Sequence, residues 1–398
     1  MNVAALLLAF PAALTAAQES PREAARRIHA DLPVIDGHND LPWEIREKLG
    51  GDPRAVDFRQ LQPQFHTDLL RLKQGGVGGQ FWSCYVGFDP DRSTAATFIE
   101  QLLLIHRLVA AYPDELEWAL TADELESARK RGKVACLVGV EGGHAIDDSL
   151  ANLRTLHSLG ARYMTLTHGG TLSWADSATD LARHGGLTPF GEEVVREMNR
   201  LGMLVDLSHV SPETMDDALR VTKAPVICSH SSARAIADHP RNVPDLQLKT
   251  IGANGGVVMV NFFPGFVVPS SAATLTDSLA RRFELKAQGL KGEALSKAMD
   301  EWNAAHPLER GSLDDVVAHI EHLAAVAGKE HVGLGSDFDG IPSVPAGLED
   351  VSKYPAITER LLERGWSEKQ VRGLLGGNVL RALREAERVA RSLRDARK

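Results

Sequence analysis

The chain has 398 residues, of which 43% are hydrophobic and 24% charged, and these proportions are typical of a soluble globular protein with a sizeable core. The formal net charge is −9, from 44 basic and 53 acidic residues, which argues against nucleic acid as a partner because phosphate binding needs clustered Lys and Arg. The three cysteines, Cys84, Cys136 and Cys228, form no CxxC motif, and we expect small buried side chains rather than a disulfide framework.

The chain begins with an apolar run from about Val3 to Ala17, followed by polar residues at 18–20. The run is shorter than the roughly 20 residues of a membrane span, and its small-residue end is typical of a secretory signal peptide. We therefore predict a signal segment over residues 1–17, an exported (periplasmic or secreted) protein, and one domain over residues 18–398. The alternative is an N-terminal helix, because no basic residue precedes the run. The charged C-terminal sequence ARSLRDARK predicts no stable membrane anchor.

Eight short apolar runs follow one another along the chain, and polar residues end most of them. They cover residues 34–40, 78–86, 134–143, 163–168, 203–209, 225–230, 256–263 and 332–340. Near-continuous apolar runs are typical of strands covered on both faces, as in parallel sheets. Helical patterns lie between most of the runs, the clearest of them over residues 147–162, 190–202, 211–222, 312–328 and 368–393. This alternation predicts an α/β protein with a (β/α)8 TIM-like barrel rather than an open sheet.

Local signals add detail to the helices. Ser211 is expected to cap the helix that follows it, and the glycines at 376–377 are expected to break or kink the last helix. Two connections are long. Residues 87–133 hold at least two helical patterns, and a charged helical insertion at 275–305 interrupts the chain before the last strand. Such an insertion either covers a site or is a solvated addition to the barrel.

Residues able to bind metals or transfer protons stand where these strands end. His38 and Asp40 are two residues apart at the end of the first strand, so alternation of side chains puts them on one face. The other strand ends carry Glu141, His168, His209, His230 and Asp337. We expect these side chains to meet, because catalytic groups of a TIM barrel come from the carboxyl ends of its strands.

Imidazole and carboxylate ligands without thiolate suit zinc, manganese, iron, cobalt or nickel. Five ligands exceed what one catalytic ion usually takes from a protein, so a pair of ions sharing one carboxylate fits better. Glu141 has a suitable place for that shared carboxylate, in the middle of the ring of strands. A cation is also expected because burying so many acidic and imidazole groups without one is costly.

Six motifs resemble one known family in their order along the chain. They read DGHNDLPW, GVEGGHAI, LTHGGTLSWADS, VDLSHVS, SHSSARAIADHPRNVPD and GSDFDG, and they run from about residue 34 to 340. Further likeness in LEDVSKYP and GGNVLR extends to about residue 380. The chain is similar to the membrane dipeptidase (renal dipeptidase) family, peptidase family M19 of the metal-dependent hydrolase superfamily. The resemblance implies a dinuclear zinc dipeptidase, with two zinc ions per chain and tolerance of a D-residue at the C-terminal position.

The resemblance also implies a role for each matching metal ligand. His38 and Asp40 would bind the first zinc, His209 and His230 the second, and Glu141 would bridge the two. A water or hydroxide between the metals would attack the peptide carbonyl, because two metals together lower the pKa of water and polarise the carbonyl. The family further implies small dipeptide substrates and a homodimer.

Three more residues receive roles from the same resemblance. His168 would contact substrate and stabilise the tetrahedral oxyanion. Arg241 would bind the free C-terminal carboxylate of the dipeptide through its two-pronged guanidinium, which limits the length of the substrate. Asp337, preferred over Asp339 two residues later, would accept a proton from the nucleophilic water and pass it to the leaving amine.

The sequence departs from the mammalian members at a few places. Gly170 stands where they carry a cysteine, so the corresponding disulfide is not expected. Phe263 and Phe266 stand in a tyrosine-bearing stretch, so a hydroxyl contact from that loop is lost. The insertion at 275–305 is not expected in those members. Two other functions remain open. One is a related binuclear amidohydrolase, lactonase or phosphoesterase. The other is a non-catalytic binding protein, which would lack ligands that this sequence has.

Overall fold

The computed structural model describes residues 19–87 and 94–396, so the predicted signal segment at 1–17 lies outside the described residues. Eight parallel strands close into a barrel, because β2 pairs with β1 on one side and with β4 on the other. The barrel strands are β1 (Val34–Asn39), β2 (Val77–Cys84), β4 (Val134–Val140), β5 (Ala161–Thr165), β6 (Leu204–Asp206), β7 (Ile227–Cys228), β8 (Val257–Val260) and β9 (Val332–Leu334). Each predicted apolar run overlaps one of these strands, which confirms the (β/α)8 barrel.

A ninth strand, β3 (Leu116–Trp118), was not predicted. It lies in the long connection where at least two helical patterns were expected, and α4 (Ala95–Ala111) and α5 (Ala122–Lys130) confirm those two. β3 pairs with the first residues of β4, on the side of that strand where β5 pairs further along. A strand of three residues is too short to show a periodic pattern, and pairing with β4 is what defines it.

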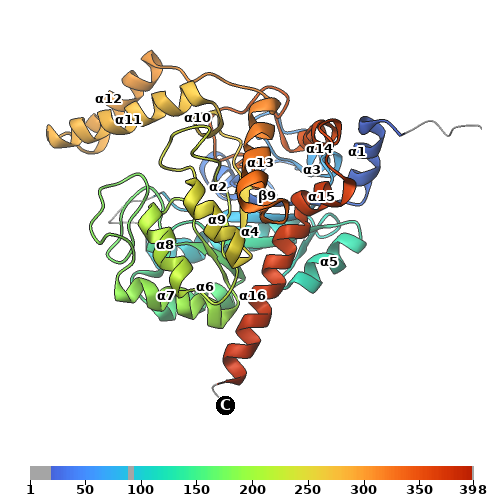
Figure 1. Ribbon diagram of the computed structural model, residues 1–398, viewed down its shortest axis with the longest axis horizontal. Helices are drawn as coiled ribbons and strands as arrows, with labels where there is room; N and C mark the ends of the chain where they lie inside the picture. Colours follow the sequence, from blue (N-terminus) through green and yellow to red (C-terminus); the bar gives the residue numbers. More distant parts are fainter. Residues whose placement is uncertain (1–18, 88–93, 397–398) are drawn as a thin grey trace, which may run out of the picture.

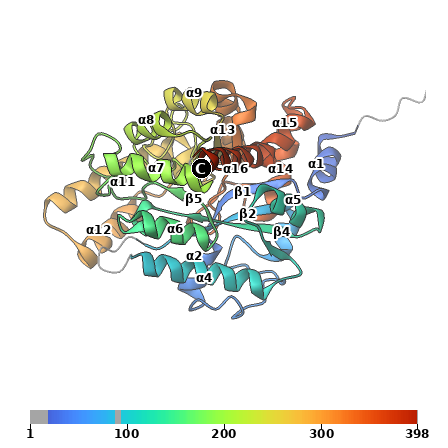
Figure 2. The ribbon, with the colours of Figure 1, turned by 90° about the horizontal axis from the view of Figure 1, so that it is seen from below.

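Helices surround the barrel, and Figures 1 and 2 show them on all of its sides. The remaining α-helices are α1 (Pro21–Ala30), α2 (Leu41–Lys48), α3 (Leu69–Gln74), α6 (Leu150–Ser158), α7 (Pro189–Leu201), α8 (Pro212–Val221), α9 (Asp245–Asn254), α10 (Pro264–Val267), α11 (Pro269–Ala287), α12 (Gly292–Ala305), α13 (Leu313–Ala327), α14 (Tyr354–Glu363), α15 (Glu368–Arg372) and α16 (Asn378–Asp395). The expected cap is present, since the Ser211 hydroxyl accepts a hydrogen bond from the Thr214 amide at 3.2 Å.

The C-terminal helical pattern is interrupted where the sequence predicted a kink. A π-helical turn at Gly373–Gly377 separates α15 from α16, and Gly376 has non-helical backbone angles. Beyond the kink, α16 buries Leu380 and Leu383 in the same apolar cluster as Leu204 and Val257, the first residues of β6 and β8. The helix therefore covers the amino ends of the strands, and the carboxyl ends are left for the residues that could do chemistry.

The predicted insertion forms a helical hairpin of α11 and α12. Figure 1 shows the two helices side by side, projecting from the body of the protein next to α10. The Ser278 hydroxyl on α11 donates a hydrogen bond of 3.0 Å to the Asn303 side-chain oxygen on α12, which joins the helices close to the body. The two helices are thus held to each other and have a defined position relative to the barrel.

The three cysteines are buried and free, as the sequence predicted. Burial raises the pKa of the Cys136 thiol to about 12, so this side chain behaves as a small apolar group. Among the helices that the structure describes, none has both the length and the apolar character needed to cross a membrane.

Buried histidines should make the protein sensitive to acid, and His29 on α1 is the clearest example. Its Nδ1 lies 2.7 Å from the Gly75 carbonyl oxygen and its Nε2 lies 2.8 Å from the Thr358 hydroxyl. Burial lowers the pKa of His29 to about 4, against a smaller opposing effect of the hydrogen bond to Gly75. The folded state therefore binds the proton less well than the unfolded state. The stabilisation is complete above about pH 6.5 and is lost as the pH falls toward 4.

We expect His29→Gln to remove part of this pH dependence. Between pH 7.5 and pH 5, His29 should cost the folded state about 2 kcal/mol, a loss that the variant does not suffer. The measurement is the free energy of unfolding in urea at the two pH values for both proteins, each treated with chelator so that metal release does not contribute. An equal loss in both proteins would show that His29 is not responsible.

Candidate metal centre

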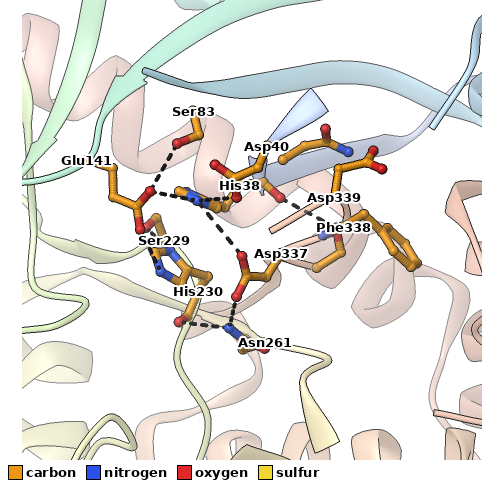
Figure 3. A network of polar contacts seen from close by, with 12 residues as sticks. His38, Asp40, Ser83, Glu141, Ser229, His230, Asn261, Asp337, Phe338 and Asp339 are labelled. Carbon is orange, nitrogen blue, oxygen red and sulfur yellow. Dashed lines mark hydrogen bonds and ion pairs between the residues drawn. The ribbon is translucent and has the colours of Figure 1, made fainter. Parts of the chain in front are cut away.

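The predicted site residues meet at the carboxyl ends of the barrel strands. Seven of them line one cavity of about 410 Å³, and these are Asp40, Glu141, His168, His209, His230, Arg241 and Asp337. His38 is fully buried immediately beside them, with its Nε2 atom 3.1 Å from an Asp40 carboxylate oxygen. Figure 3 shows the side chains of His38, Asp40, Glu141 and Asp337 pointing toward one another.

Glu141, directly after β4, lies at the centre of the cluster. Its Oε1 atom is 3.1 Å from Nε2 of His209, 3.4 Å from Nε2 of His168 and 3.6 Å from Nε2 of His230. Its Oε2 atom is 3.5 Å from Nε2 of His38 and accepts a hydrogen bond from the Ser83 hydroxyl. One oxygen of the carboxylate thus faces three imidazoles and the other faces a fourth, which is the arrangement a shared ligand needs.

Some polar atoms of the cluster lie close to charged neighbours without a hydrogen bond of suitable geometry. Nε2 of His38 and Oδ1 of Asp40 are buried and make no hydrogen bond to any residue in the described part of the chain. Nε2 of His209 and Nε2 of His230 lie only 2.9 Å apart. Unpaired buried polar atoms and converging ring nitrogens are unfavourable unless a cation lies between them. The residues therefore fit a metal centre.

Three overlapping groups of side chains have ligand atoms close enough to hold an ion. They are His38 with Glu141 and His230, Glu141 with His168 and His209, and His38 with Asp40 and Asp337. Glu141 belongs to two of these groups and His38 to two. An arrangement of overlapping groups suits two neighbouring cations better than one.

Neighbouring hydrogen bonds hold His38 in the tautomer that a metal requires. The Tyr163 hydroxyl donates to the Gly37 carbonyl oxygen at 3.1 Å, so it accepts from Nδ1 of His38 at 2.9 Å. The Nε2 atom of His38 faces the cluster, where it would offer its lone pair to a bound cation in place of a proton. Gly139 makes room for this tyrosine, because a Cβ atom at position 139 would collide with the Tyr163 ring.

His230 is held in the same tautomer by a second relay. The Ser229 hydroxyl donates to the Asp206 carboxylate at 2.6 Å and accepts from Nδ1 of His230 at 2.7 Å. Imidazole ligands commonly donate their second N–H in this way, which fixes the ring and raises its basicity. Burial, and then nearby positive charges, lower the pKa values of His209 and His230 well below the ordinary range. Both rings are therefore neutral, as metal ligands must be.

The pKa values of two acidic side chains of the site shift in opposite directions. Burial alone raises the pKa of Glu141, but the charges of His38 and His168 outweigh this and hold it well below its ordinary value. Burial raises the pKa of Asp337 to about 8, and the negative charges of Asp40 and Glu141 add to the rise while His38 opposes it. Crowded carboxylates repel one another in the protein alone, and a dication removes that repulsion.

Asp337 and Asp339 have similar backbone conformations, with φ of 65° each, but point to different partners. Asp337 accepts a hydrogen bond of 2.8 Å from the Asn261 side chain and lies at the cluster. Asp339 accepts from the backbone amide of His66 at 2.6 Å and so ties two loops together. The structure therefore favours Asp337 as the group nearer the chemistry.

Arg241 lies in the loop after β7 and its guanidinium is buried, with an exposed fraction of 4% for the residue. Its nitrogens lie 3.3 Å from the Ser231 hydroxyl and 3.4 Å from the His230 carbonyl oxygen, and its guanidinium lies 5.2 Å from the centre of the Phe266 ring. In the described part of the chain, no carboxylate lies close enough to form an ion pair with Arg241. A buried guanidinium in this position is suited to an anionic group of a ligand.

Sequence reasoning missed the residues that support the ligands. Tyr163 lies inside an apolar strand, where a tyrosine is indistinguishable from packing. Asn261 could have been found, because it directly follows the apolar run of β8 and so stands at a strand end like the other site residues. Ser83 and Ser229 carry no signal in a single sequence, because small polar residues are common at the ends of strands.

Comparisons with known proteins identify the relatives of this chain. Residues 22–397 match the sequence pattern of the family described as membrane dipeptidase (peptidase family M19). The chain is 41% identical to Dipeptidase 3 of Mus musculus over 374 residues, which cover 92% of this chain and 67% of that protein.

Solved structures show the same fold. The probable dipeptidase PvdM from Pseudomonas aeruginosa is 23% identical, with a TM-score of 0.83 over 93% of this chain and 99% of that one. A metallo peptidase from Rhodobacter sphaeroides, solved with a phosphinate mimic of the dipeptide L-Ala-D-Ala, is 26% identical, with a TM-score of 0.72 over 89% of this chain and 99% of that one.

Proposed function

Since this chain belongs to the membrane dipeptidase family, peptidase family M19, and is a metallo-dipeptidase, we propose that it cleaves dipeptides at a dinuclear zinc centre. The observation that carries the proposal is the position of Glu141, whose Oε2 atom faces His38 while its Oε1 atom faces His209 and His230. His38 and Asp40 would hold one ion, His209 and His230 the other, and Glu141 both. Two zinc ions would supply Lewis-acid polarisation of the scissile carbonyl and a hydroxide nucleophile at neutral pH.

The protein residues around the centre bind and orient the substrate. Arg241 would bind the free carboxylate of the dipeptide, since its guanidinium is buried at the rim of the cavity with no carboxylate partner in the described part of the chain. A substrate extended past this arginine would meet the wall formed by Phe266, which is how the site would select dipeptides. His168, whose side chain is 25% exposed and faces Glu141, would contact the carbonyl oxygen as negative charge develops on it.

Asp337 would move the proton. Asn261 donates to one of its oxygens and leaves the other facing His38 at 4.0 Å, so the carboxylate is held in one orientation. In that position it would accept the proton of the nucleophilic water and deliver it to the leaving amine. We also propose tolerance of a D-residue at the C-terminal position, which the L-Ala-D-Ala mimic bound by the Rhodobacter sphaeroides relative supports.

Two further parts of the proposal concern the whole protein. The apolar run at 1–17 supports export to the periplasm or the medium, and a processed N-terminus in purified material would establish it. A homodimer is the assembly that the family resemblance implies. The mass of the purified protein in solution measures it directly.

Metal removal tests the proposed centre. We expect a chelator to lower hydrolysis of a dipeptide by at least ~100-fold, and zinc to restore it with two equivalents bound per chain. The measurement combines the rate with the metal content of the protein at each step of the titration. Activity indifferent to both treatments would exclude metal catalysis, and full recovery at one equivalent would exclude a dinuclear requirement.

The second candidate function is a related amide, lactone or phosphoester hydrolase using the same residues. It would be favoured if N-acyl amino acids, lactones or phosphoesters turned over much faster than dipeptides in the zinc-loaded protein. A panel of these substrates beside L-L and L-D dipeptides separates the two functions.

A further inference from the structure

A second cavity adjoins the substrate site on the side of the inserted hairpin. It has a volume of about 440 Å³ and lies between the barrel and the base of α11 and α12. Its apolar lining consists of Phe263, Leu275, Trp302, Leu308 and Pro342. Phe263 and Pro342 also line the cavity that holds the candidate metal ligands, so the two cavities share a wall.

The shared wall stands next to Arg241. The guanidinium of Arg241 lies 5.2 Å from the centre of the Phe266 ring, and that ring meets Phe263 edge to face at 5.1 Å. Phe263 in turn lies close to Leu275 of the hairpin, with Gly265 between them. A Cβ atom on Gly265 would lie 2.6 Å from the Phe263 ring and 2.8 Å from the Leu275 side chain, so both side chains approach the same point. An unbroken series of apolar side chains therefore leads from the arginine to the second cavity.

Several polar side chains of the second cavity are hydrogen-bonded within the protein. The Ser278 hydroxyl is bonded to Asn303, and Nδ1 of His306 lies 2.7 Å from the Trp302 carbonyl oxygen. The rings of Trp302 and His306 stack at 4.0 Å, which fixes the tryptophan against the cavity. The cavity thus offers apolar surface and few free polar groups, and this is suited to a hydrocarbon or aromatic side chain.

We propose that this cavity is a specificity subsite for a large apolar side chain on the C-terminal residue of the dipeptide. The proposal rests on the proposed function, in which Arg241 holds the carboxylate of that residue. The Cα atom of the C-terminal substrate residue is one bond from that carboxylate. The side chain of this residue therefore leaves the backbone beside Phe266 and Phe263 and reaches toward Trp302. The N-terminal side chain belongs at another part of the cavity wall, where Trp43 and Tyr85 meet edge to face at 4.9 Å.

Two dipeptides of identical composition test the assignment, glycyl-phenylalanine and phenylalanyl-glycine. The readout is kcat/KM for glycyl-phenylalanine divided by kcat/KM for phenylalanyl-glycine, measured in the zinc-loaded enzyme. We expect Trp302→Ala to lower the ratio by about 10-fold or more, because burial of an aromatic side chain contributes roughly that much to binding. Thr274→Phe, which fills the same cavity from α11, should also lower the ratio. The control Met299→Ala lies on the same hairpin, outside this cavity, and should leave the ratio unchanged.

The outcomes separate the subsite from the proposed function. If neither dipeptide is hydrolysed by the wild-type enzyme, the proposed function fails. If both are hydrolysed and neither cavity variant changes the ratio, the subsite assignment is wrong while the proposed function stands. If the variants slow phenylalanyl-glycine selectively, the cavity takes the N-terminal side chain and the assignment is overturned.

Discussion

Replacing Glu141 by glutamine is expected to lower kcat/KM for a dipeptide by at least ~10³-fold, about 4 kcal/mol of transition-state stabilisation. The substitution keeps the shape of the side chain and removes its charge. Oxygens of Glu141 lie within 3.6 Å of four imidazole nitrogens, so the change reaches every part of the cluster at once. The amide can offer only one oxygen, and the carboxylate offers two. The variant should therefore also lose bound metal, which elemental analysis of the purified protein measures.

The temperature of thermal unfolding distinguishes loss of the metal centre in Glu141→Gln from misfolding of the variant. The pKa of Glu141 lies well below its ordinary value, so its charge stabilises the metal-free fold, and the metal-free variant should still unfold cooperatively, at a temperature somewhat below that of the metal-free wild type. Glu193→Gln, an equivalent change at an exposed position on α7, serves as the control and should keep rate and metal content. A Glu141→Gln enzyme with two bound ions and a wild-type rate would contradict the bridging role.

Replacing Arg241 by alanine is expected to lower kcat/KM for dipeptides by ~10²- to 10³-fold, since loss of one partner of a buried charge pair costs about 2–5 kcal/mol. The loss should depend on the substrate carboxylate. A dipeptide amide, which lacks that charge, should be a poor substrate of the wild-type enzyme and should be slowed little further by the substitution. The measurement is the ratio of kcat/KM for a dipeptide to that for its amide in both enzymes.

Arg234→Ala is the matched control, because Arg234 stands in the same segment and pairs with Asp238 at the surface. It should leave the ratio of the two substrates unaltered. Equal losses for dipeptide and amide in the Arg241 variant would assign the arginine a structural role. Fast turnover of acyl-amino acids or lactones, unaffected by the substitution, would favour the second candidate function.

The barrel could be predicted from the sequence because its strands carry their own signal. Each apolar run is buried on both faces, so composition alone marks it, and the chemically active residues stand at the carboxyl ends of these runs. β3 could not be predicted in this way. It has three residues, of which only Leu116 is buried. Its pairing partner is the first three residues of β4, which lie 18 residues further along the chain.

The candidate site was predictable to a different degree for each residue. His38, Asp40 and Glu141 stand at strand ends, where the fold alone brings them together. Arg241 stands in a loop 11 residues after His230, and nothing in a single sequence says that such a loop folds back over the cavity. Its expected role came from the resemblance to a family, and the structure adds its burial and its contact with Phe266.

The choice between Asp337 and Asp339 shows what spacing cannot decide. Two residues apart in an extended strand, both side chains would share a face. Both residues instead have positive φ values beyond the end of β9, so alternation no longer applies to them. One carboxylate reaches Asn261 and the other the His66 backbone, a difference that depends on contacts across the barrel.

The close approach of Gly139 and Tyr163 has an evolutionary consequence. Any side chain at position 139 displaces the tyrosine, and any residue at 163 without a hydroxyl leaves Nδ1 of His38 without its acceptor. Neither position can therefore drift alone, and a lineage that changed one would need a compensating change at the other. Inherited substitutions at the two positions should be epistatic. This pair of positions inside the barrel therefore restricts which sequences can keep this catalytic centre.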